Sequence, residues 1–264
     1  MRACSLAARE FSRAALSHVG RHITVNHVRR IKQCAALLTA NSAFQHVRSL
    51  DLGVTSKSSN SENYLGEQLT ILGIFAQHQT LTRLWLSKIP FPSFDPDQRE
   101  KIRNIVVALS STVNDLGLYE CRFLSRVDMI SFICTFSHCD SLYVRDCVAD
   151  GGGCAGNMFS GLPKHKLFLD ALELTSTLPN RPPTDAPPTI DVSSFIEDAA
   201  LDVSRLSTLI CDIWSTEQAR SVAATTSVSP IQHFQLGCAE PGGFHGTCET
   251  PNLDPALNLF PSRV

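Results

Sequence analysis

Two histidines near the N-terminus have a spacing that can bind metal. His18 and His22 are four residues apart, so on a helix they would share one face, as paired zinc ligands can. No glutamate lies between them, and no third ligand follows nearby in the sequence. We therefore interpret both as solvent-exposed histidines and expect no metal site there.

A second group near the C-terminus has a loose metal-like composition within the segment GCAEPGGFHGTC. A tetrahedral zinc site needs four ligands, and this segment supplies three, so a distant cysteine would have to complete it. The residues concerned are Cys238, His245 and Cys248, with Cys211 as the fourth candidate. The pattern is too sparse to predict a zinc site.

Other catalytic motifs are also missing from the sequence. The glycine run Gly151–Gly156 lacks the lysine and the following hydroxyl residue that would hold a phosphate and magnesium, so we interpret it as a turn. Neither a GxSxG elbow nor a P-loop occurs. We expect a protein that is not an enzyme, with no catalytic residue, no metal and no cofactor.

The composition limits the class of protein. Hydrophobic residues make up 43% of the 264 residues and charged residues 18%, which favours a folded chain with a sizeable core. The net charge of −2 gives no sign of nucleic-acid binding. The ten cysteines are spread singly, and no secretory segment or membrane-length apolar run occurs. We expect free thiols, no membrane partner, and a cytoplasmic or nuclear location.

A repeat emerges when the chain is compared with itself. Short segments carry two apolar residues separated by one variable residue, as half-buried strands do. They are Val47–Leu52, Thr82–Ser87, Val113–Cys121, Asp140–Cys147, Asp170–Ser176 and His233–Cys238. Their first apolar residues are Leu50, Leu84, Leu116, Leu142, Leu172 and Phe234, at steps of 34, 32, 26, 30 and 62 residues. A weaker strand, Arg205–Ile210, divides the last gap at Leu206.

Helical periodicity separates these strands, over Leu65–Gln79, Arg99–Ser111, Val127–His138 and Ser193–Val203. Asp95 and Asp97 are expected to cap a helix that starts near Gln98. One strand and one helix cannot bury their own apolar faces, but stacked units can. The predicted fold is α/β, a solenoid with short parallel strands and outer helices. A doubly wound α/β domain is the alternative.

Three segments without periodicity are predicted to be loops. The proline-rich stretch at 178–188 has five prolines and reads as an insertion between two halves of the solenoid. Asp150–Gly156 and the polar stretch Ser56–Asn63 are the other two.

In strands of this type the residues beside the leucines face outward and form a concave binding surface. Tryptophan, tyrosine and arginine dominate the energetics of protein interfaces. The candidate partner-binding residues are Arg83, Trp85, Ser87, Asp115, Tyr119, Tyr143, Arg145 and Glu173. The alternative interpretation is that Trp85 and Tyr143 only cover the edges of the core.

Three segments resemble a known family. Arg2–Val25 (RACSLAAREFSRAALSHVGRHITV) resembles the second half of an F-box, and Val25–Leu52 resembles the link into the repeats of the F-box and leucine-rich-repeat-like proteins of mushroom-forming fungi. Val113–Cys147 resembles one repeat of the same proteins. The resemblance implies a partial F-box-like segment at 1–25 and a leucine-rich-repeat-like solenoid at 26–264. It also implies a substrate-recognition subunit of a cullin–RING ubiquitin ligase that binds a Skp-type adaptor and an unidentified protein substrate.

Two alternatives accompany this resemblance. The first half of an F-box, with its leucine–proline helix, is missing before residue 1, which puts adaptor binding in question and leaves a stand-alone repeat scaffold as the second function. The arginine- and serine-rich, acid-poor N-terminus is also typical of a mitochondrial transit peptide. We prefer a helix with one solvated arginine face, because the sequence continues directly into the repeat.

Overall fold

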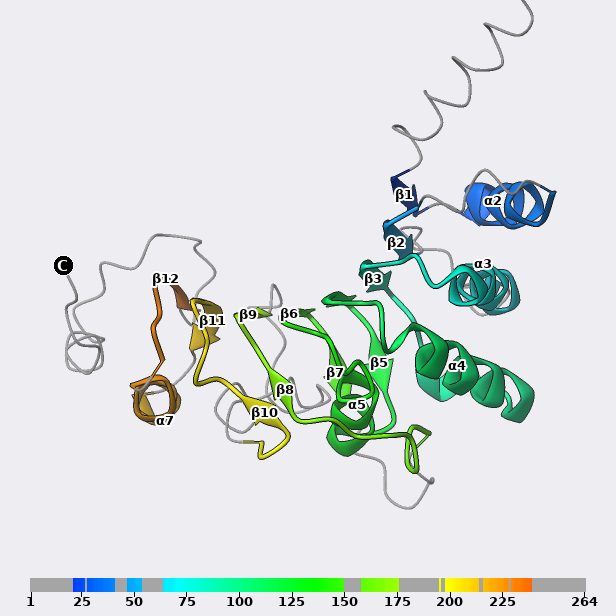
Figure 1. Ribbon diagram of the computed structural model, residues 1–264. Helices are drawn as coiled ribbons and strands as arrows, with labels where there is room; N and C mark the ends of the chain where they lie inside the picture. The colour runs from blue at the N-terminus through cyan, green and yellow to red at the C-terminus, as the bar shows by residue number, and fades with distance from the viewer. Residues whose placement is uncertain are drawn as a thin grey trace, which may run out of the picture.

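A parallel sheet forms the centre of the computed structural model, which describes residues 21–26, 28–40, 47–53, 64–149, 158–175, 195, 198–213, 216–227 and 229–238. The fold is α/β, and within these residues eight strands form the sheet (Figure 1). The strands are His22–Val25 (β1), Ser49–Gly53 (β2), Arg83–Ser87 (β3), Asp115–Tyr119 (β4), Ser141–Arg145 (β6), Ala171–Thr175 (β9), Thr208–Ile213 (β11) and His233–Cys238 (β12). They lie side by side in the order of the chain.

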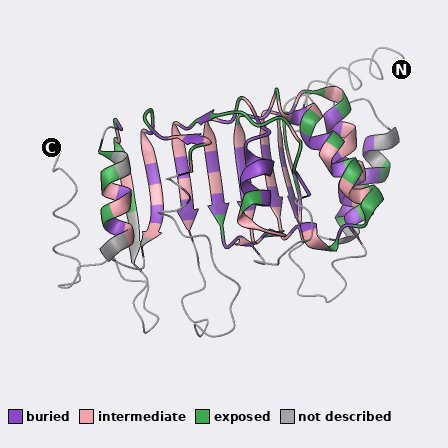
Figure 2. Ribbon diagram, turned by 90° about the horizontal axis from the view of Figure 1, so that it is seen from below, coloured by how far each residue is buried: buried purple, intermediate pink, exposed green. Residues whose placement is uncertain are grey.

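The register of neighbouring strands does not slip. Leu50 is paired with Leu84, Leu84 with Leu116, and Leu116 with Leu142, each in a parallel ladder. Because side chains alternate along a strand, this register collects the leucines into two buried rows on one face of the sheet. The first row is Leu50, Leu84, Leu116, Leu142, Leu172 and Leu209, and the second is Leu52, Leu86, Leu118, Val144, Leu174 and Cys211. The strands of Figure 2 show the alternation as coloured bands.

An outer layer covers the leucine face, on the convex side of the curve in Figure 1. Its helices are Val28–Ala40 (α2), Leu65–His78 (α3), Pro96–Leu109 (α4), Arg126–Ile133 (α5) and Thr216–Thr226 (α7), with a 3-10 turn at Phe91–Ser93 (η3). Helix α3 packs between α2 and α4.

Beyond α4 the outer layer is partly extended chain. Arg122–Phe123 (β5) pairs with Val148–Ala149 (β7), and Leu167–Phe168 (β8) pairs with Leu201–Asp202 (β10). Beneath them lies a cluster of buried rings whose centroids are 4.7 to 5.8 Å apart. Its members are Phe91, Phe94, Phe123, Phe132, Phe136 and Phe159.

Three successive strands end in the same turn. Lys88, Glu120 and Asp146 each follow the last residue of a strand and adopt positive φ angles of 59°, 51° and 52°. In this conformation the N–H of each residue donates to the carbonyl at the end of the next strand, at 2.7 to 3.0 Å. The turn therefore continues the ladder for one residue beyond each strand and holds the spacing of the units.

Most predicted strands and helices are confirmed, with boundaries moved by a few residues. Helix α4 begins at Pro96 because Asp95 is its N-cap: the Asp95 carboxylate accepts from the Gln98 N–H at 2.8 Å, and the Gln98 side chain accepts from the Asp95 N–H. Asp97 lies inside the first turn. Helix α5 ends at Ile133, earlier than predicted, where the Cys134 carbonyl accepts from the N–H of His165.

Two predictions in the last third are wrong. The strand near residue 206 is Thr208–Ile213, and Leu209, not Leu206, is paired with Leu172 and Phe234. Leu206 is buried just ahead of the strand and is not part of it.

The helix predicted at Ser193–Val203 is also wrong for its second half. Residues 198–200 form a turn in which the Asp198 carboxylate accepts from the Ala200 N–H at 3.0 Å. Leu201 and Asp202 then pair as a strand, and Leu201 and Val203 are buried. Apolar residues spaced for one helix face therefore serve a turn and a short strand.

Several predicted features lie outside the described residues: the F-box-like segment except residues 21–25, the loops Ser56–Asn63 and Asp150–Gly156, and the proline-rich stretch at 178–188. Of residues 21–25, His22–Val25 is strand β1, paired with β2. None of the helices in the described ranges is both long and apolar enough to span a membrane.

Asp128 is a fully buried carboxyl group in the outer layer. One oxygen accepts from the Phe159 N–H at 2.8 Å, while Oδ2 has no partner among the described residues. Burial raises the pKa of Asp128, and backbone hydrogen bonds, first that from Phe159, lower it in part. The ionised form is therefore held at a cost in the folded state.

We predict that lowering the pH increases the stability of the wild type relative to that of the Asp128→Asn variant. As the pH falls through the raised folded-state pKa, the folded protein binds a proton that the unfolded chain does not, so the contribution of Asp128 to stability increases. Urea unfolding over a pH series should show the free energy of unfolding of the wild type rising relative to that of the variant as the pH falls. Asp97→Asn, exposed on α4, is the matched control. A difference that stays flat would contradict the assignment.

Candidate functional site

All eight candidate partner-binding residues lie on the sheet face opposite the helices. We call this the concave face, because the strands curve toward it in Figure 1. In the register of the strands the residues form three rows, and each of the eight side chains is partly or fully exposed. The first row holds Arg83 and Asp115, the second Trp85, Tyr143 and Glu173, and the third Ser87, Tyr119 and Arg145.

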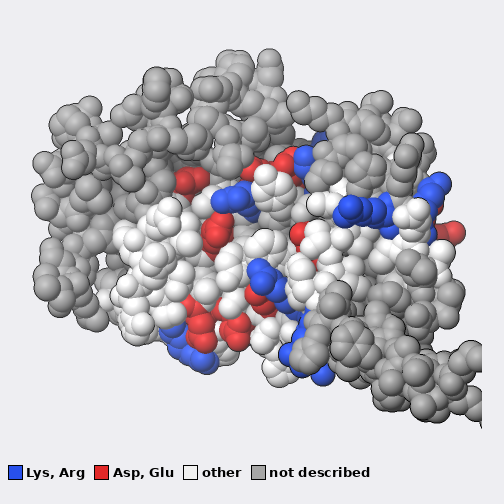
Figure 3. Space-filling view, turned by 90° about the horizontal axis from the view of Figure 1, so that it is seen from above, with Lys and Arg blue, Asp and Glu red and all other residues white. Residues whose placement is uncertain are grey.

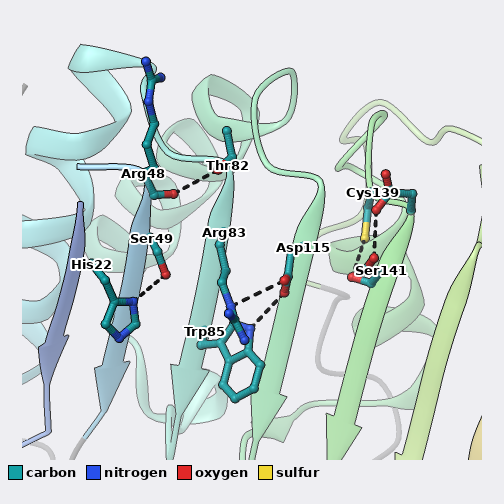
Figure 4. A network of polar contacts seen from close by, with 10 residues as sticks. His22, Arg48, Ser49, Thr82, Arg83, Trp85, Asp115, Cys139 and Ser141 are labelled. Carbon is teal, nitrogen blue, oxygen red and sulfur yellow. Dashed lines mark hydrogen bonds and ion pairs between the residues drawn. The ribbon is translucent and has the colours of Figure 1, made fainter. Parts of the chain in front are cut away.

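Trp85 is held by a carboxylate on the next strand. The indole Nε1–H donates to Asp115 Oδ1 at 2.9 Å, and Arg83 Nε lies 3.4 Å from Asp115 Oδ2 (Figure 4). The Arg83 guanidinium carbon also lies 4.3 Å from the centroid of the indole ring. One carboxylate thus fixes an aromatic ring and the cation that stacks on it.

Tyr143 meets Trp85 from two strands away. Their ring centroids are 5.5 Å apart with the planes tilted by 41°. The strand between them contributes Gly117 at the same level, paired with both residues. A methyl group on Gly117 would come within 2.7 to 2.8 Å of three atoms of the indole ring. The missing side chain is therefore what lets Trp85 lie across β4 and reach Tyr143.

A second polar group lies toward the end of the strands. Arg145 Nη2 is 3.4 Å from Glu173 Oε1, and Arg145 Nε donates to Thr175 Oγ1 at 3.1 Å. Thr175 in turn donates to Glu173 at 3.2 Å, and the Arg145 guanidinium lies 5.9 Å from the Tyr119 ring centroid. Each arginine of the concave face is thus oriented by an acidic partner on the neighbouring strand.

Ser87 and the first strand occupy the margin of this arrangement. Ser87 packs against Gly53, where an added Cβ would lie 2.4 Å from the serine Cβ. On β1, His22 hydrogen-bonds to Ser49 at 2.7 Å and to Thr24 at 2.9 Å through its two ring nitrogens.

The titration behaviour of the face follows from burial and acidic neighbours. The pKa of Tyr143 is raised by burial and then by Asp115, with Arg83 opposing. Burial, followed by Glu120, raises the pKa of Tyr119. Both phenols therefore keep their proton at neutral pH and can donate hydrogen bonds to a bound molecule.

The candidate metal ligands are not brought together within the described residues. Cys211 lies in the second buried row of the core, and His22 lies at the far end of the sheet on β1. Cys238 is the last residue of β12, while His18, His245, Cys248 and the run Gly151–Gly156 lie outside the described residues. In the described part of the chain no group of three or more potential ligands could hold a metal ion.

The fold and this face define an α/β protein whose parallel sheet is covered by an outer layer on one side and displays an aromatic and charged surface on the other. Comparison with known proteins adds no relative: neither a protein-family model, nor a curated protein, nor a solved structure matches the chain.

Gly117 was not among the candidate residues, and its role beneath Trp85 was missed. A glycine at the centre of a strand with leucines on both sides is the signal that was available, because such a glycine often marks a close approach. Asp51 on β2 is paired with Trp85 and lies on the same face, but it was not among the candidate binding residues.

We predict that Gly117→Ala displaces the Trp85 indole. The added methyl group collides with the ring, so the bond to Asp115 breaks and stability falls by about 1 to 3 kcal/mol. In a Trp214→Phe background, which leaves Trp85 as the single tryptophan of the chain, its fluorescence should shift to longer wavelength.

The matched control is Gly66→Ala in α3, where an added Cβ meets nothing within 4 Å. It should leave both the emission and the stability intact, since alanine favours a helix over glycine. Unchanged emission in Gly117→Ala would show that the ring does not lie on Gly117.

Proposed function

We propose that the chain is a protein-interaction module whose concave face holds a partner protein. The observation that carries this proposal is the contact group of Arg83, Trp85, Asp115 and Tyr143, which displays two large rings and an oriented cation on an open sheet face. Rigid aromatic side chains supply contact area at a small cost in conformational entropy, and arginine is enriched with them at interface centres.

The proposed architecture is a leucine-rich-repeat-like solenoid. Support comes from the strand order, which follows the chain without reversal, and from the outer layer on a single side (Figure 1). A doubly wound sheet would reverse its strand order at a switch point and carry helices on both faces. Stacked units of this kind form extended concave surfaces that suit protein binding.

The proposed cellular role is that of a substrate-recognition subunit of a cullin–RING ubiquitin ligase, in the cytoplasm or nucleus. Its support is the resemblance of Arg2–Val25 to part of an F-box and of Val113–Cys147, which spans β4 to β6, to a repeat of the same proteins. A stand-alone scaffold with the same concave face is the second candidate, favoured because the residues of that face, from Arg83 to Glu173, all lie outside the F-box-like segment.

We predict that the triple variant Trp85→Ala, Tyr143→Ala and Arg145→Ala loses its partner. Proximity labelling in cells, followed by binding measurements with the purified candidate, should show affinity reduced by roughly 100-fold or more, because these residues have the character of interface hot spots.

A triple variant on the outer layer, Lys101→Ala, Val107→Ala and Phe168→Ala, is the control. It also removes one cation and two exposed apolar groups, since Val107 is 41% and Phe168 49% exposed. Circular dichroism must show that both variants are folded. Full-strength capture by the concave-face variant would refute the proposed binding surface.

Adaptor binding separates the two candidate roles. If the chain is a ligase subunit, the full chain should bind a purified Skp-type adaptor in titration calorimetry. Substituting Leu6 and Phe11, on the predicted apolar face of the N-terminal segment, should abolish that binding, while the concave-face variant should retain it. If the intact chain does not bind the adaptor, the stand-alone scaffold is the favoured role.

A further inference from the structure

One row of the concave face has an acid at each end and the aromatic pair between them. Asp51, Trp85, Gly117, Tyr143 and Glu173 are paired in sequence across five neighbouring strands. With strands about 4.8 Å apart, the row is roughly 19 Å long. A peptide held on this face would therefore meet carboxylates as well as the two rings.

The two arginines beside this row do not make it basic. Arg83 and Arg145 are each bound by a carboxylate of the same face, Asp115 and Glu173. The acids lie beneath the cations, with side chains 24% and 19% exposed against 42% and 45% for the arginines. These pairs orient the guanidinium groups and cancel most of their charge.

Besides Asp115 and Glu173, which pair with the arginines, two acids lie beside the aromatic pair. Asp51 is half-buried on β2, and Asp140, just before β6, accepts from the Ser141 hydroxyl at 2.9 Å. Four carboxylates therefore surround Trp85 and Tyr143 against two guanidinium groups, and Figure 3 shows acidic and basic side chains interspersed across this face. The same excess contributes to the raised pKa of Tyr143, for which burial is the first cause and Asp115, Glu173 and Asp140 add to it.

We infer that the segment held on the concave face is basic: an extended stretch of the partner protein whose lysine or arginine side chains lie against Asp51 and Asp140 while a side chain between them packs on Trp85 and Tyr143. This inference rests on the proposed function and names the chemistry of the partner. The net negative charge attracts such a segment and repels an acidic one.

The positions of the two acids give the spacing of the basic residues. Asp51 and Asp140 are three strands apart across the sheet and three residues apart along it, which places their Cα atoms about 17 Å from each other. An extended chain covers that distance in about five residues. Between the two cations the segment passes beside the tilted ring pair, where an aliphatic or aromatic side chain can pack on the rings.

A displayed library of random short peptides, selected on the full chain, tests the inference. Peptides should be counted only if Tyr143→Ala abolishes their capture. We expect two lysine or arginine positions about five residues apart to be enriched among these peptides.

Binding of a selected synthetic peptide is then measured with charge variants of the full chain. Asp51→Asn and Asp140→Asn should each weaken it roughly threefold or more, and raising the ionic strength should weaken it further. The matched control Asp97→Asn, exposed on α4 behind the sheet, should leave the affinity unchanged.

The outcomes separate this inference from the proposed function. Tyr143-dependent peptides that are neutral or acidic overturn the basic partner and leave the binding face in place. Equal affinity for wild type, Asp51→Asn and Asp140→Asn does the same. If no captured peptide depends on Tyr143, both the inference and the proposed binding face fail.

Discussion

The structure depends on one constraint, the in-register pairing of parallel strands that follow each other along the chain. A shift of one residue in any pair would turn the leucines of that strand toward solvent and bring its polar residues into the core. Turns that end in Lys88, Glu120 and Asp146 help to prevent such a shift, because their backbone N–H groups extend the ladder past each strand. The thiol of Cys121 adds a similar link, donating to the Leu86 carbonyl at 3.3 Å.

The in-register pairing of the strands also determines which residues are neighbours on the concave face. Residues about 30 positions apart in the chain become neighbours at the same level, so Arg83, Trp85 and Asp115 form one group although no local motif contains all three. Gly117 extends the group by a further strand, since only an absent side chain leaves room for the indole. The chemistry of the face is that of oriented rings and paired charges, which favours recognition of another molecule by shape and charge.

The repeated pattern of two apolar residues around a variable one predicted the strands that carry Leu50, Leu84, Leu116, Leu142 and Leu172, because each strand buries one face against a continuous core. It placed the strand of Leu209 three residues too early. Periodicity gave a wrong prediction where a segment forms a turn and a short strand of the outer layer. Ala199, Ala200 and Val203 have helical spacing, yet residues 198–200 form a turn, and Leu201 and Val203 are buried in and beside a short strand paired with β8. The candidate site could be predicted as a list of outward residues. The contact of Trp85 with Tyr143 could not, because it joins strands that are not neighbours.

The change in the outer layer after α4 has a geometric consequence. A helix is about 10 Å wide, whereas strands are spaced by about 4.8 Å, so side-by-side helices force a sheet to bend away from them. Helices α2, α3 and α4 pack in this way, while the short strands β5, β7, β8 and β10 match the spacing of the sheet and relax the bend. The local radius of the arc is thus set on the side opposite the candidate binding residues. Exchanging an outer helix for a short strand would open the arc, and so widen the space that it encloses, without altering any side chain on its inner surface.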